Sequence, residues 1–460
     1  MTSSIARNPF LPADTGPANW WEVYKFARLV LLWMSFIFIP VWGAAWLVGI
    51  VLPYLIEGIT GIPADVRMNT ANVLRALTPL VAVMVFIPIN AMFMVLQERR
   101  ALALFTVRKG PNRVGLFGFN MDGMFQTAAD AVKLLLKESI TPRGADSLMF
   151  TLAPIIFFAP SVFGAIPLLA PVTGNHPLFQ MVNLPTGIFF VLAMSSIPVI
   201  GIVMGGWASN NKYSLVGGLR SAAQAISYEI PLVLSLVVVC MVAGTLDVVQ
   251  IAQGQQGLPA SPGGFWHWNI IGGEAFLKGM QSGNPGHIAA ALGLAVSMVI
   301  LFFIYLTGAC AEINRIPFDL PEAESELVSG YNTEYGGIKF AIFFLAEFTN
   351  LFIVSTIATV LFLGGGAPLF PGFLDAAFFD HILGALKSFP TPETTFFDPK
   401  TFSALIWGVS KVYVLIFTAV LVRGTLPRFR IDQLLDFGWK RLIPLTLILL
   451  LAVSYLKELV

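Results

Sequence analysis

The chain has 460 residues, 56% of them hydrophobic and only 12% charged, and its formal net charge is +1. Soluble domains carry about 25% charged residues, so this composition excludes an ordinary soluble protein and indicates a chain embedded in lipid. The balanced charge excludes the basic signature of a nucleic-acid-binding protein, and Cys240 and Cys310 lack the spacing of a metal site.

Apolar runs fill most of the chain. About nine of them reach the roughly 20 residues that a helix needs to cross a bilayer, which predicts an all-α, polytopic integral membrane protein. The predicted spans are 28–52, 73–96, 148–170, 185–205, 228–245, 288–311, 339–363, 402–422 and 441–457. A polar head with Asp14 and Glu22 precedes the first run. It is too long and too acidic for a signal peptide, so we expect this span to be retained.

The distribution of lysine and arginine predicts the orientation. Most of the 27 basic residues fall on one side of the membrane if the N-terminus is cytoplasmic, with concentrations in 97–147 and 423–441. The positive-inside rule favours this arrangement. It places the acidic loop 312–338 on the cytoplasmic side and the Gly/Pro-rich loops 246–287 and 364–401 on the outer side.

A basic segment follows the second predicted span and begins with Arg99 and Arg108. Residues 124–138 then place apolar side chains at helical spacing. This stretch is too short and too charged to span, so it predicts an amphipathic helix at the cytoplasmic interface. Membrane anchoring accounts for the basic residues, but it requires no acids such as Glu98 and Asp130.

The most informative segment is AEINRIPFDLPEAESELVSGYNTEYGGIKFAIFFLAEFTN, residues 311–350. Its acidic residues outnumber Arg315 and Lys339, and they are Glu312, Asp319, Glu322, Glu324, Glu326, Glu334 and Glu347. Carboxylates are costly at a membrane and are seldom kept there without a use. Neighbouring carboxylates in a dry medium raise one another's pKa, so Glu322, Glu324 and Glu326 can exchange protons near neutral pH. A solvated acidic loop that pairs with a partner's basic surface is the alternative.

Ionisable residues also occur at or inside the predicted spans. Glu229 lies at the mouth of one span, whereas Glu347 and Lys411 lie well inside theirs. Insertion scales assign about 2.5–3.5 kcal/mol to such a group at mid-membrane, so each should face protein or water, or be neutral. We therefore expect proton handling at these positions. For Glu229, a capped or snorkelling residue is the alternative.

Several ordered segments carry a family resemblance. They read ERRALALFTVRKGPNRVG, ADAVKLLLKE, GWASNNKYSLVGGLRSAAQAISYE, the acidic segment above, and RGTLPRFRIDQLLDFGWKRLIPL. Together they resemble the quinone-channel membrane subunit of respiratory complex I, the proton-pumping NADH:quinone oxidoreductase. The match runs from about residue 74 to the C-terminus, and so many ordered segments make coincidence implausible.

The resemblance implies a subunit that joins a peripheral redox arm to antiporter-like membrane subunits and binds no redox centre itself. Quinone would be the substrate, and FMN and iron–sulfur clusters would lie in partner subunits. Expected partners are the peripheral quinone-site and iron–sulfur subunits, the small membrane subunits and the antiporter-like subunits, in a bacterial inner membrane. The choice between ubiquinone and menaquinone, and the identity of the electron donor, stay open.

The resemblance also implies roles for individual residues. The quinone cavity would be lined or shaped by Arg99, Arg108, Asp130, Arg315, Phe318 and Asp319. An acidic link that couples the cavity to proton translocation would comprise Glu229, Glu312, Glu322, Glu324, Glu326 and Glu347.

The chain departs from the family pattern at its N-terminus. The family's common form has one span fewer, so 28–52 is expected to be an added helix. We therefore expect two units, residues 1–70 with the polar segment and the added helix, and residues 71–460 as the family's membrane domain. The outer loops are also longer than the family pattern predicts.

Other classes of protein fit less well. The equivalent subunit of a membrane-bound hydrogenase shares the acidic loop, but RKGPNRVG and PFDLPEAESELVSGYNTEYGG favour the quinone enzyme. A secondary proton-coupled transporter would show inverted repeats, and the sequence shows no internal duplication. A haem-binding subunit needs histidines inside spans, whereas the 4 histidines fall in or beside the predicted outer loops.

Overall fold

The computed structural model describes residues 40–41, 43–45, 47–57, 64–108, 110–111, 114, 123, 125–174, 184–256, 264–321, 324–370, 378–380 and 399–460. Within these ranges the regular secondary structure is entirely helical. The prediction of an all-α membrane protein is confirmed.

Eight helical segments of the described chain are long and apolar enough to cross a membrane. They are α3 (Ala64–Phe105), α5 (Ser147–Val172), α6 with α7 (Gly187–Ser196 and Pro198–Ala208), α8 (Lys212–Ala243), α11 (Pro285–Glu312), α13 (Gly337–Phe362), α15 (Pro399–Thr425), and α16 with α17 (Ile431–Phe437 and Ile443–Leu459). The last two are joined by the π-helical η7 (Gly438–Leu442). Each segment coincides with a predicted span from 73–96 onward.

The first predicted span, 28–52, lies mostly outside the described residues. Its described end includes η1 (Leu47–Val51), which continues into α2 (Leu52–Glu57). Both pack against α3. The added N-terminal segment therefore lies beside the first helix of the family region.

Shorter helices lie at the two ends of the bundle. At one end are α4 (Phe125–Leu136), which is the predicted amphipathic helix, α12 (Glu324–Leu327) and η5 (Gly330–Asn332). At the other end are α9 (Val248–Gly254), η3 (Phe265–His267), η4 (Asn269–Ile271) and α10 (Gly273–Gln281). Following the predicted orientation, we name these the inner end and the outer end.

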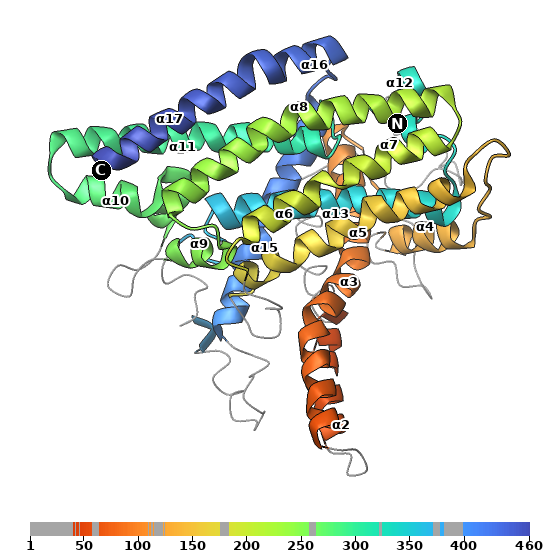
Figure 1. The fold of residues 1–460 in the computed structure, drawn as a ribbon, viewed down its shortest axis with the longest axis horizontal. Helices are drawn as coiled ribbons and strands as arrows, with labels where there is room; N and C mark the ends of the chain where they lie inside the picture. Colours follow the sequence, from red (N-terminus) through yellow and green to blue (C-terminus); the bar gives the residue numbers. More distant parts are fainter. Residues whose placement is uncertain are drawn as a thin grey trace, which may run out of the picture.

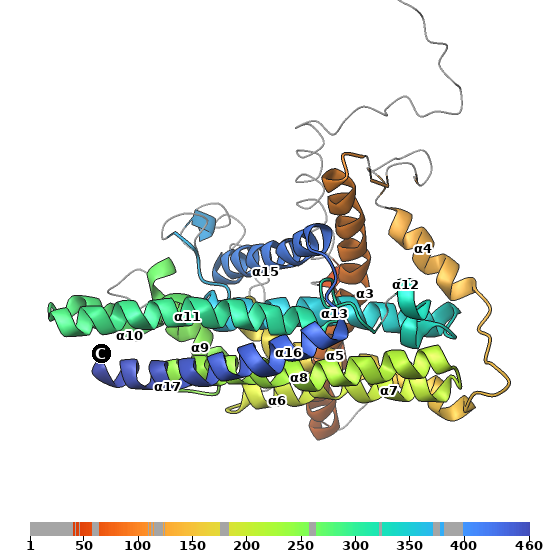
Figure 2. The ribbon, with the colours of Figure 1, turned by 90° about the horizontal axis from the view of Figure 1, so that it is seen from above.

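The long helices form one bundle, which α3 crosses. Figure 1 shows α5, α7, α8, α11, α13 and α17 running along the long axis of the molecule. In Figures 1 and 2, α3 lies steeply across them, and its N-terminal half stands away from the bundle with α2 beside it. The C-terminal end of α3 reaches the inner end, where it meets α13, α15 and α4.

Caps and small residues set these helices in place. Asp146 caps the start of α5 and Asn211 caps the start of α8, each through its side-chain oxygen. At Gly201 of α7 an added Cβ would lie only 2.8 Å from the backbone nitrogen of Phe157 in α5. Membrane helices associate through such close contacts, because lipid offers little hydrophobic drive for helix pairing.

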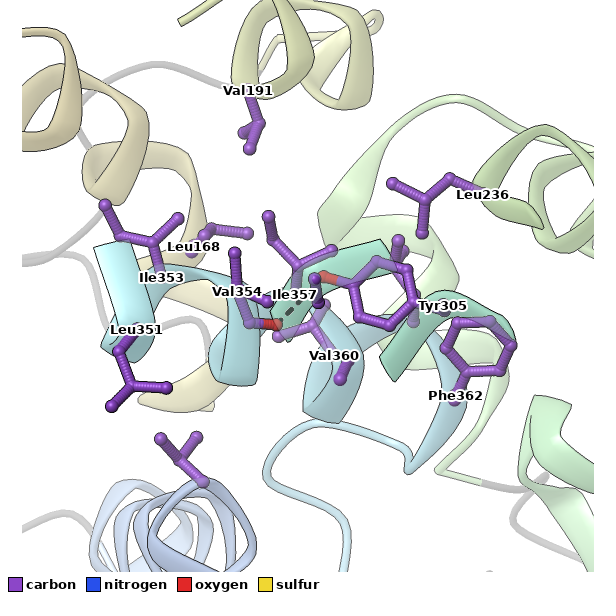
Figure 3. Close-up of a cluster of buried hydrophobic side chains, with 14 of the residues drawn as sticks. Leu168, Val191, Leu236, Tyr305, Leu351, Ile353, Val354, Ile357, Val360 and Phe362 are labelled. Atoms are coloured by element: carbon purple, nitrogen blue, oxygen red, sulfur yellow. Dashed lines mark hydrogen bonds between the residues drawn. The ribbon is translucent and has the colours of Figure 1, made fainter. Parts of the chain in front are cut away.

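Figure 3 shows the packed centre of the bundle, where Leu168, Leu236, Tyr305 and Val354 come together from four helices. Tyr305 is fully buried, and its hydroxyl donates a 2.9 Å hydrogen bond to the carbonyl of Val354. A buried hydroxyl without a partner would be costly, so this bond makes the polar group tolerable in the core. It also ties α11 to α13, the helices that carry Glu312 and Glu347.

Candidate functional site

A polar cavity of about 330 Å³ lies at the inner end of the bundle. Its wall is formed by the end of α3, the turn that follows α11, the η5 turn, α13 and the end of α15. The polar lining residues are Glu98, Arg99, Asn314, Arg315, Asp319, Ser329, Asn332, Glu347 and Arg423. The fold therefore brings the predicted cavity residues Arg99, Arg315 and Asp319 together with the predicted coupling residue Glu347.

Glu98 is the electrostatic centre of this cavity. Its two carboxylate oxygens each accept a 3.0 Å hydrogen bond from Nη1 of Arg315, and it also forms an ion pair with Arg423. Glu98 and Arg315 are almost completely buried, and the Arg315 guanidinium lies 4.4 Å from the ring centroid of Phe348. Buried charges need such partners because their desolvation is expensive. Two guanidinium groups therefore flank this carboxylate, and the lining as a whole holds three cations, Arg99, Arg315 and Arg423, and three acidic residues, Glu98, Asp319 and Glu347.

The Arg315 guanidinium retains donor capacity. Its Nη2 is buried and has no hydrogen-bond partner among the described residues. A guanidinium carries five N–H donors, and buried donors are normally satisfied by protein, water or ligand. Arg315 can thus bind an acceptor without giving up Glu98.

Arg99 connects the cavity to the amphipathic helix. Its Nη1 lies 2.7 Å from Oδ2 of Asp130 in α4. Both side chains are exposed by a third or more, so the pair contributes at most about 1 kcal/mol. The pair places α4 next to the cavity. Arg99 lines the cavity, whereas Asp130 contacts Arg99 and does not line it.

Three of the residues predicted for the cavity, Arg108, Asp130 and Phe318, lie outside its described lining. Arg108 is exposed beyond the end of α3, where its Nε donates a 3.1 Å hydrogen bond to Oγ1 of Thr106. Phe318 is buried between the rings of Tyr228 and Phe429, at centroid distances of 5.3 and 5.6 Å. Phe318 therefore anchors the turn that forms the cavity wall, and the role of Arg108 stays a prediction.

Glu347 joins the cavity to the acidic segment. Glu347 lies within α13 and lines the cavity. This agrees with the expectation that an ionisable residue inside an apolar run faces protein or water. Its Oε1 accepts a 2.6 Å hydrogen bond from the hydroxyl of Tyr331, which is fully buried in η5. The carboxyl group is thus held at the border between the bundle and the inner turn.

Glu229 and Glu312 lie deeper in the bundle. Glu229 accepts a hydrogen bond from Ser196, and Glu312 is close enough to Glu229 for the two to interact electrostatically. Glu312 borders a second cavity of about 40 Å³, large enough for a water molecule. Ile313 lines both this small cavity and the larger one, so the two cavities share a wall residue. Other polar residues around the small cavity are Ser161, Ser195, Ser221 and Asn350.

The loop carboxylates differ from expectation where the structure describes them. Glu326 is exposed and pairs with Arg220 at 2.7 Å. The hydrogen bond from Arg220 lowers the pKa of Glu326 below its usual value, so the expected mutual raising of the pKa is wrong for this residue. Among the described side chains, the cation of Arg220 has the largest effect on Glu326. The side chains of Glu322 and Glu324 lie outside the described residues, and their roles stay predictions.

Lys411 lies in a cage of acceptors. Its Nζ donates to the backbone carbonyls of Leu363, Gly365 and Ala367 at 2.6, 3.0 and 2.6 Å. It also lies 4.1 Å from the ring centroid of Trp268. Three carbonyl acceptors and the ring face stabilise the ammonium form of Lys411. Proton handling at Lys411 stays a prediction.

Sequence reasoning did not assign five polar members of the lining to the cavity, namely Glu98, Asn314, Ser329, Asn332 and Arg423. Asn314 follows α11 in the left-handed conformation, with φ of +52°, which turns the chain into the cavity wall. Arg423 was counted only among the basic residues that set the orientation. Arg423 lies at the end of a predicted span on the same side of the membrane as Glu98. This shared depth could have predicted from the sequence that the two residues meet. Within the described ranges, no group of three His, Cys, Asp or Glu residues forms a metal site.

Comparison with known proteins agrees with these features. A model of the NADH dehydrogenase family matches residues 78–454. The chain belongs to this family. The resemblance inferred from the ordered segments is therefore confirmed.

Relatives of the chain align with most of its length, and three of them are H subunits of NADH-quinone oxidoreductase. The second such protein of Koribacter versatilis is 38% identical over 382 residues, which is 80% of this chain and 92% of the relative. The Brevibacillus brevis protein is 39% identical over 358 residues, 77% of this chain and 86% of the relative. The Bacillus cytotoxicus protein is 40% identical over 367 residues, which is 79% of this chain and 89% of the relative.

Proposed function

We propose that the chain is the quinone-channel membrane subunit of a proton-translocating NADH:quinone oxidoreductase and that its inner cavity receives the quinone headgroup. The observation that carries this proposal is the meeting of Glu98, Arg315, Glu347 and Arg423 around one cavity. These residues come from four separate segments of the chain. The cavity volume of about 330 Å³ lies in the range of pockets that bind small organic molecules.

The chemistry of the cavity suits a quinone. Quinone carbonyl oxygens accept hydrogen bonds, and reduction places negative charge on them. Arg315, Arg423 and Asn314 offer donors, whereas Phe344 and Phe348 supply an apolar wall for the ring. Donors that are held in position before the reaction stabilise charge that develops during it.

The same arrangement supports a proton link from the cavity into the bundle. Reduction of a quinone to a quinol takes up two protons and transiently adds negative charge. Glu347 borders the cavity, and Glu312 lies behind Ile313 and close to Glu229. A change of charge in the cavity would alter the proton affinity of these carboxylates. In this proposal Glu326 acts as a fixed negative charge, and Glu322 and Glu324 stay predicted members of the link.

The assembly follows from the same proposal. FMN and iron–sulfur clusters would belong to partner subunits, which deliver electrons to a quinone bound beside this chain. The partners would be the peripheral quinone-site and iron–sulfur subunits, the small membrane subunits and the antiporter-like subunits. The complex would lie in a bacterial inner membrane with the N-terminus of this chain in the cytoplasm. Residues 71–460 would form the family domain.

Substitution of a cavity residue tests the proposal. Arg315→Gln should lower quinone-dependent NADH oxidation by at least about tenfold, because a fixed donor to the developing charge is lost. NADH oxidation by an artificial acceptor that takes electrons upstream should be unchanged. Arg99→Ala, which leaves the Glu98 network intact, should raise the KM for quinone through the loss of a cation at the cavity.

The control is Lys440→Gln, which removes an exposed basic residue paired with Asp436 and should change neither activity. Equal loss of both activities in Arg315→Gln and Arg99→Ala would show that these arginines serve assembly. Mass spectrometry of the solubilised complex separates the alternatives: an NADH-oxidising flavoprotein supports the proposal, and a nickel–iron subunit would identify a hydrogenase. A chain that purifies without redox partners would favour a transporter.

The proton link has its own test. Glu312→Gln should lower quinone turnover and proton pumping together in an assembled complex. The proposed coupling fails if this variant pumps the normal number of protons per electron at the normal rate.

A further inference from the structure

One face of α8 holds the inner segments in register. Arg220, Ser221, Gln224 and Tyr228 recur at helical spacing, so they point to the same side of the helix. Arg220 pairs with Glu326, while the other three contact the turn after α11 through hydrogen bonds or ring packing. Glu229 follows Tyr228 on the same helix.

Gln224 makes the densest set of contacts on this face. Its Nε2 lies 2.7 Å from the carbonyl of Ala311, 2.7 Å from the carbonyl of Phe318 and 3.2 Å from Oδ1 of Asn314. Only 1% of Gln224 is exposed. One amide group therefore closes the turn from Ala311 to Phe318 at both of its ends.

The turn carries backbone hydrogen bonds of its own, including those from Asn314 N–H to the Ala311 carbonyl and from Leu320 N–H to the Phe318 carbonyl. Asn314 adopts the left-handed conformation in the middle of the turn. A carbonyl oxygen has two lone pairs, so the carbonyls of Ala311 and Phe318 can each accept a second hydrogen bond, and Gln224 supplies it from a separate helix.

We propose that Gln224 is a positioning residue of the quinone reaction. Its amide fixes the turn that places Arg315 in the large cavity and Glu312 at the small one, and it fixes this turn to the helix that carries Glu229. This inference rests on the proposed function of the cavity. Gln224 lines neither cavity itself and contacts the large cavity's wall only through residues of the turn such as Asn314, so its effect passes through the turn.

A neutral amide fits this role for a chemical reason. Its NH2 group offers two donors to backbone carbonyls without adding charge between Glu229 and Glu312. A lysine would add charge, and a methionine of similar length would fill the space without donating. The test should therefore remove the hydrogen bonds of the Gln224 amide while keeping the volume of the side chain.

The chain supplies a matched control in Gln255. This residue is also 1% exposed, and its Nε2 also donates to two backbone carbonyls, those of Ile251 and Val360, at 3.2 and 2.9 Å. It lies at the outer end of the bundle, away from the cavity. Gln224→Met and Gln255→Met thus remove the same kind of contact at the same burial.

The experiment compares both variants in the intact complex, by quinone titration and by NADH oxidation with an upstream artificial acceptor. Gln224→Met should raise the KM for a short-chain quinone by about tenfold, because a displaced turn misplaces Arg315. Gln255→Met should leave that KM unchanged. In both variants, the activity with the artificial acceptor should be proportional to the amount of assembled complex. Equal KM values in the two variants would overturn the inference.

Two further variants keep the outcome decisive. If Gln224→Met fails to assemble, Gln224→Asn retains an amide that is one methylene too short, and a raised KM supports the role while a normal KM overturns it. Arg99→Ala, in the cavity wall, serves as the reference for the proposed function. A raised KM in Arg99→Ala with a normal KM in both Gln224 variants defeats this inference alone, whereas a normal KM in all of them defeats the proposed quinone cavity.

Discussion

Burial decides how much each ion pair contributes at this site. The Arg315–Glu98 pair has side chains that are 11% and 6% exposed, whereas the Arg99–Asp130 pair has side chains that are 46% and 36% exposed. Water screens the second pair, and an exposed pair of this kind is worth about 0–1 kcal/mol. Loss of one member of the first pair would leave a buried charge without its partner.

The two acids can be compared directly. Glu98→Gln should destabilise the folded subunit by roughly 3–5 kcal/mol, the usual cost of breaking a buried pair. Asp130→Asn should cost about 1 kcal/mol or less. The thermal midpoint for loss of the solubilised complex, followed by native gel or light scattering, measures both. Similar shifts in the two variants would contradict the importance of burial here.

Glu326 makes a prediction about pH. Its pKa is lowered from the usual 4.5, first by the hydrogen bond from Arg220. A lowered folded-state pKa means that the stabilising interaction is fully present above pH 4.5 and is lost only as the pH falls through the lower, folded-state value. Glu326 therefore stays ionised around neutral pH. Glu326→Gln should leave the shape of the pH–rate profile for quinone reduction unchanged between about pH 6 and 8. A limb of the profile that moves within this range would make Glu326 a proton carrier.

At the scale of elements, α13 is held at both ends by other segments. At the inner end, Tyr331 binds Glu347. At the outer end, the last carbonyls of the helix accept hydrogen bonds from three side chains, with Gln255 donating to Val360, Asn269 to Leu361 and Lys411 to Leu363. Helix ends carry unpaired carbonyls, and within a membrane these must be satisfied by protein. The predicted proton carrier Lys411 is thus part of a helix cap.

Lys411→Met tests this cap. It should lower the thermal stability of the complex, because three carbonyls lose their donor, but should leave the number of protons pumped per electron unchanged. Lys457→Met is the matched control, since Lys457 donates only to the carbonyl of Met241 and should have a smaller effect. Reduced pumping per electron at normal stability would instead restore Lys411 as a proton carrier.

At the scale of the whole molecule, the added N-terminal segment lies apart from the cavity. η1 and α2 pack against α3, and α3 carries Glu98 and Arg99 only near its opposite end. In Figure 1 the N-terminal half of α3 and α2 stand away from the rest of the bundle. We therefore predict that the cavity functions independently of the N-terminal segment.

Deletion of residues 1–62 tests this independence. The complex should assemble with near-normal quinone reductase activity, because the cavity lining begins at Val95. The basic segment 97–147 should keep the orientation, since its charge bias outweighs the few basic residues at the new N-terminus. Protease accessibility of the inner loops provides the orientation control. Low activity in a correctly oriented, assembled complex would show that the added helix shapes the cavity.

Much of the fold followed from local sequence. Apolar runs of membrane-crossing length predicted the eight described spans and the amphipathic helix 124–138, because span length and periodicity are properties of contiguous residues. The ordered segments also identified the family. The orientation stays a prediction, and the span 28–52 lies mostly outside the described residues.

Only the tertiary structure decided which charges meet. Glu98 and Arg423 lie far apart in the sequence yet form one ion pair, Glu326 pairs with Arg220 on another helix, and Lys411 lies among carbonyls. A side chain's type determines what it can donate, accept or carry as charge. Its partners and its burial determine the protonation state and the role, and both depend on contacts between segments that are remote along the chain. For that reason the sequence identified the carboxylates and arginines of this protein, and the packing of its helices assigned them to the cavity, the inner turn and the helix caps.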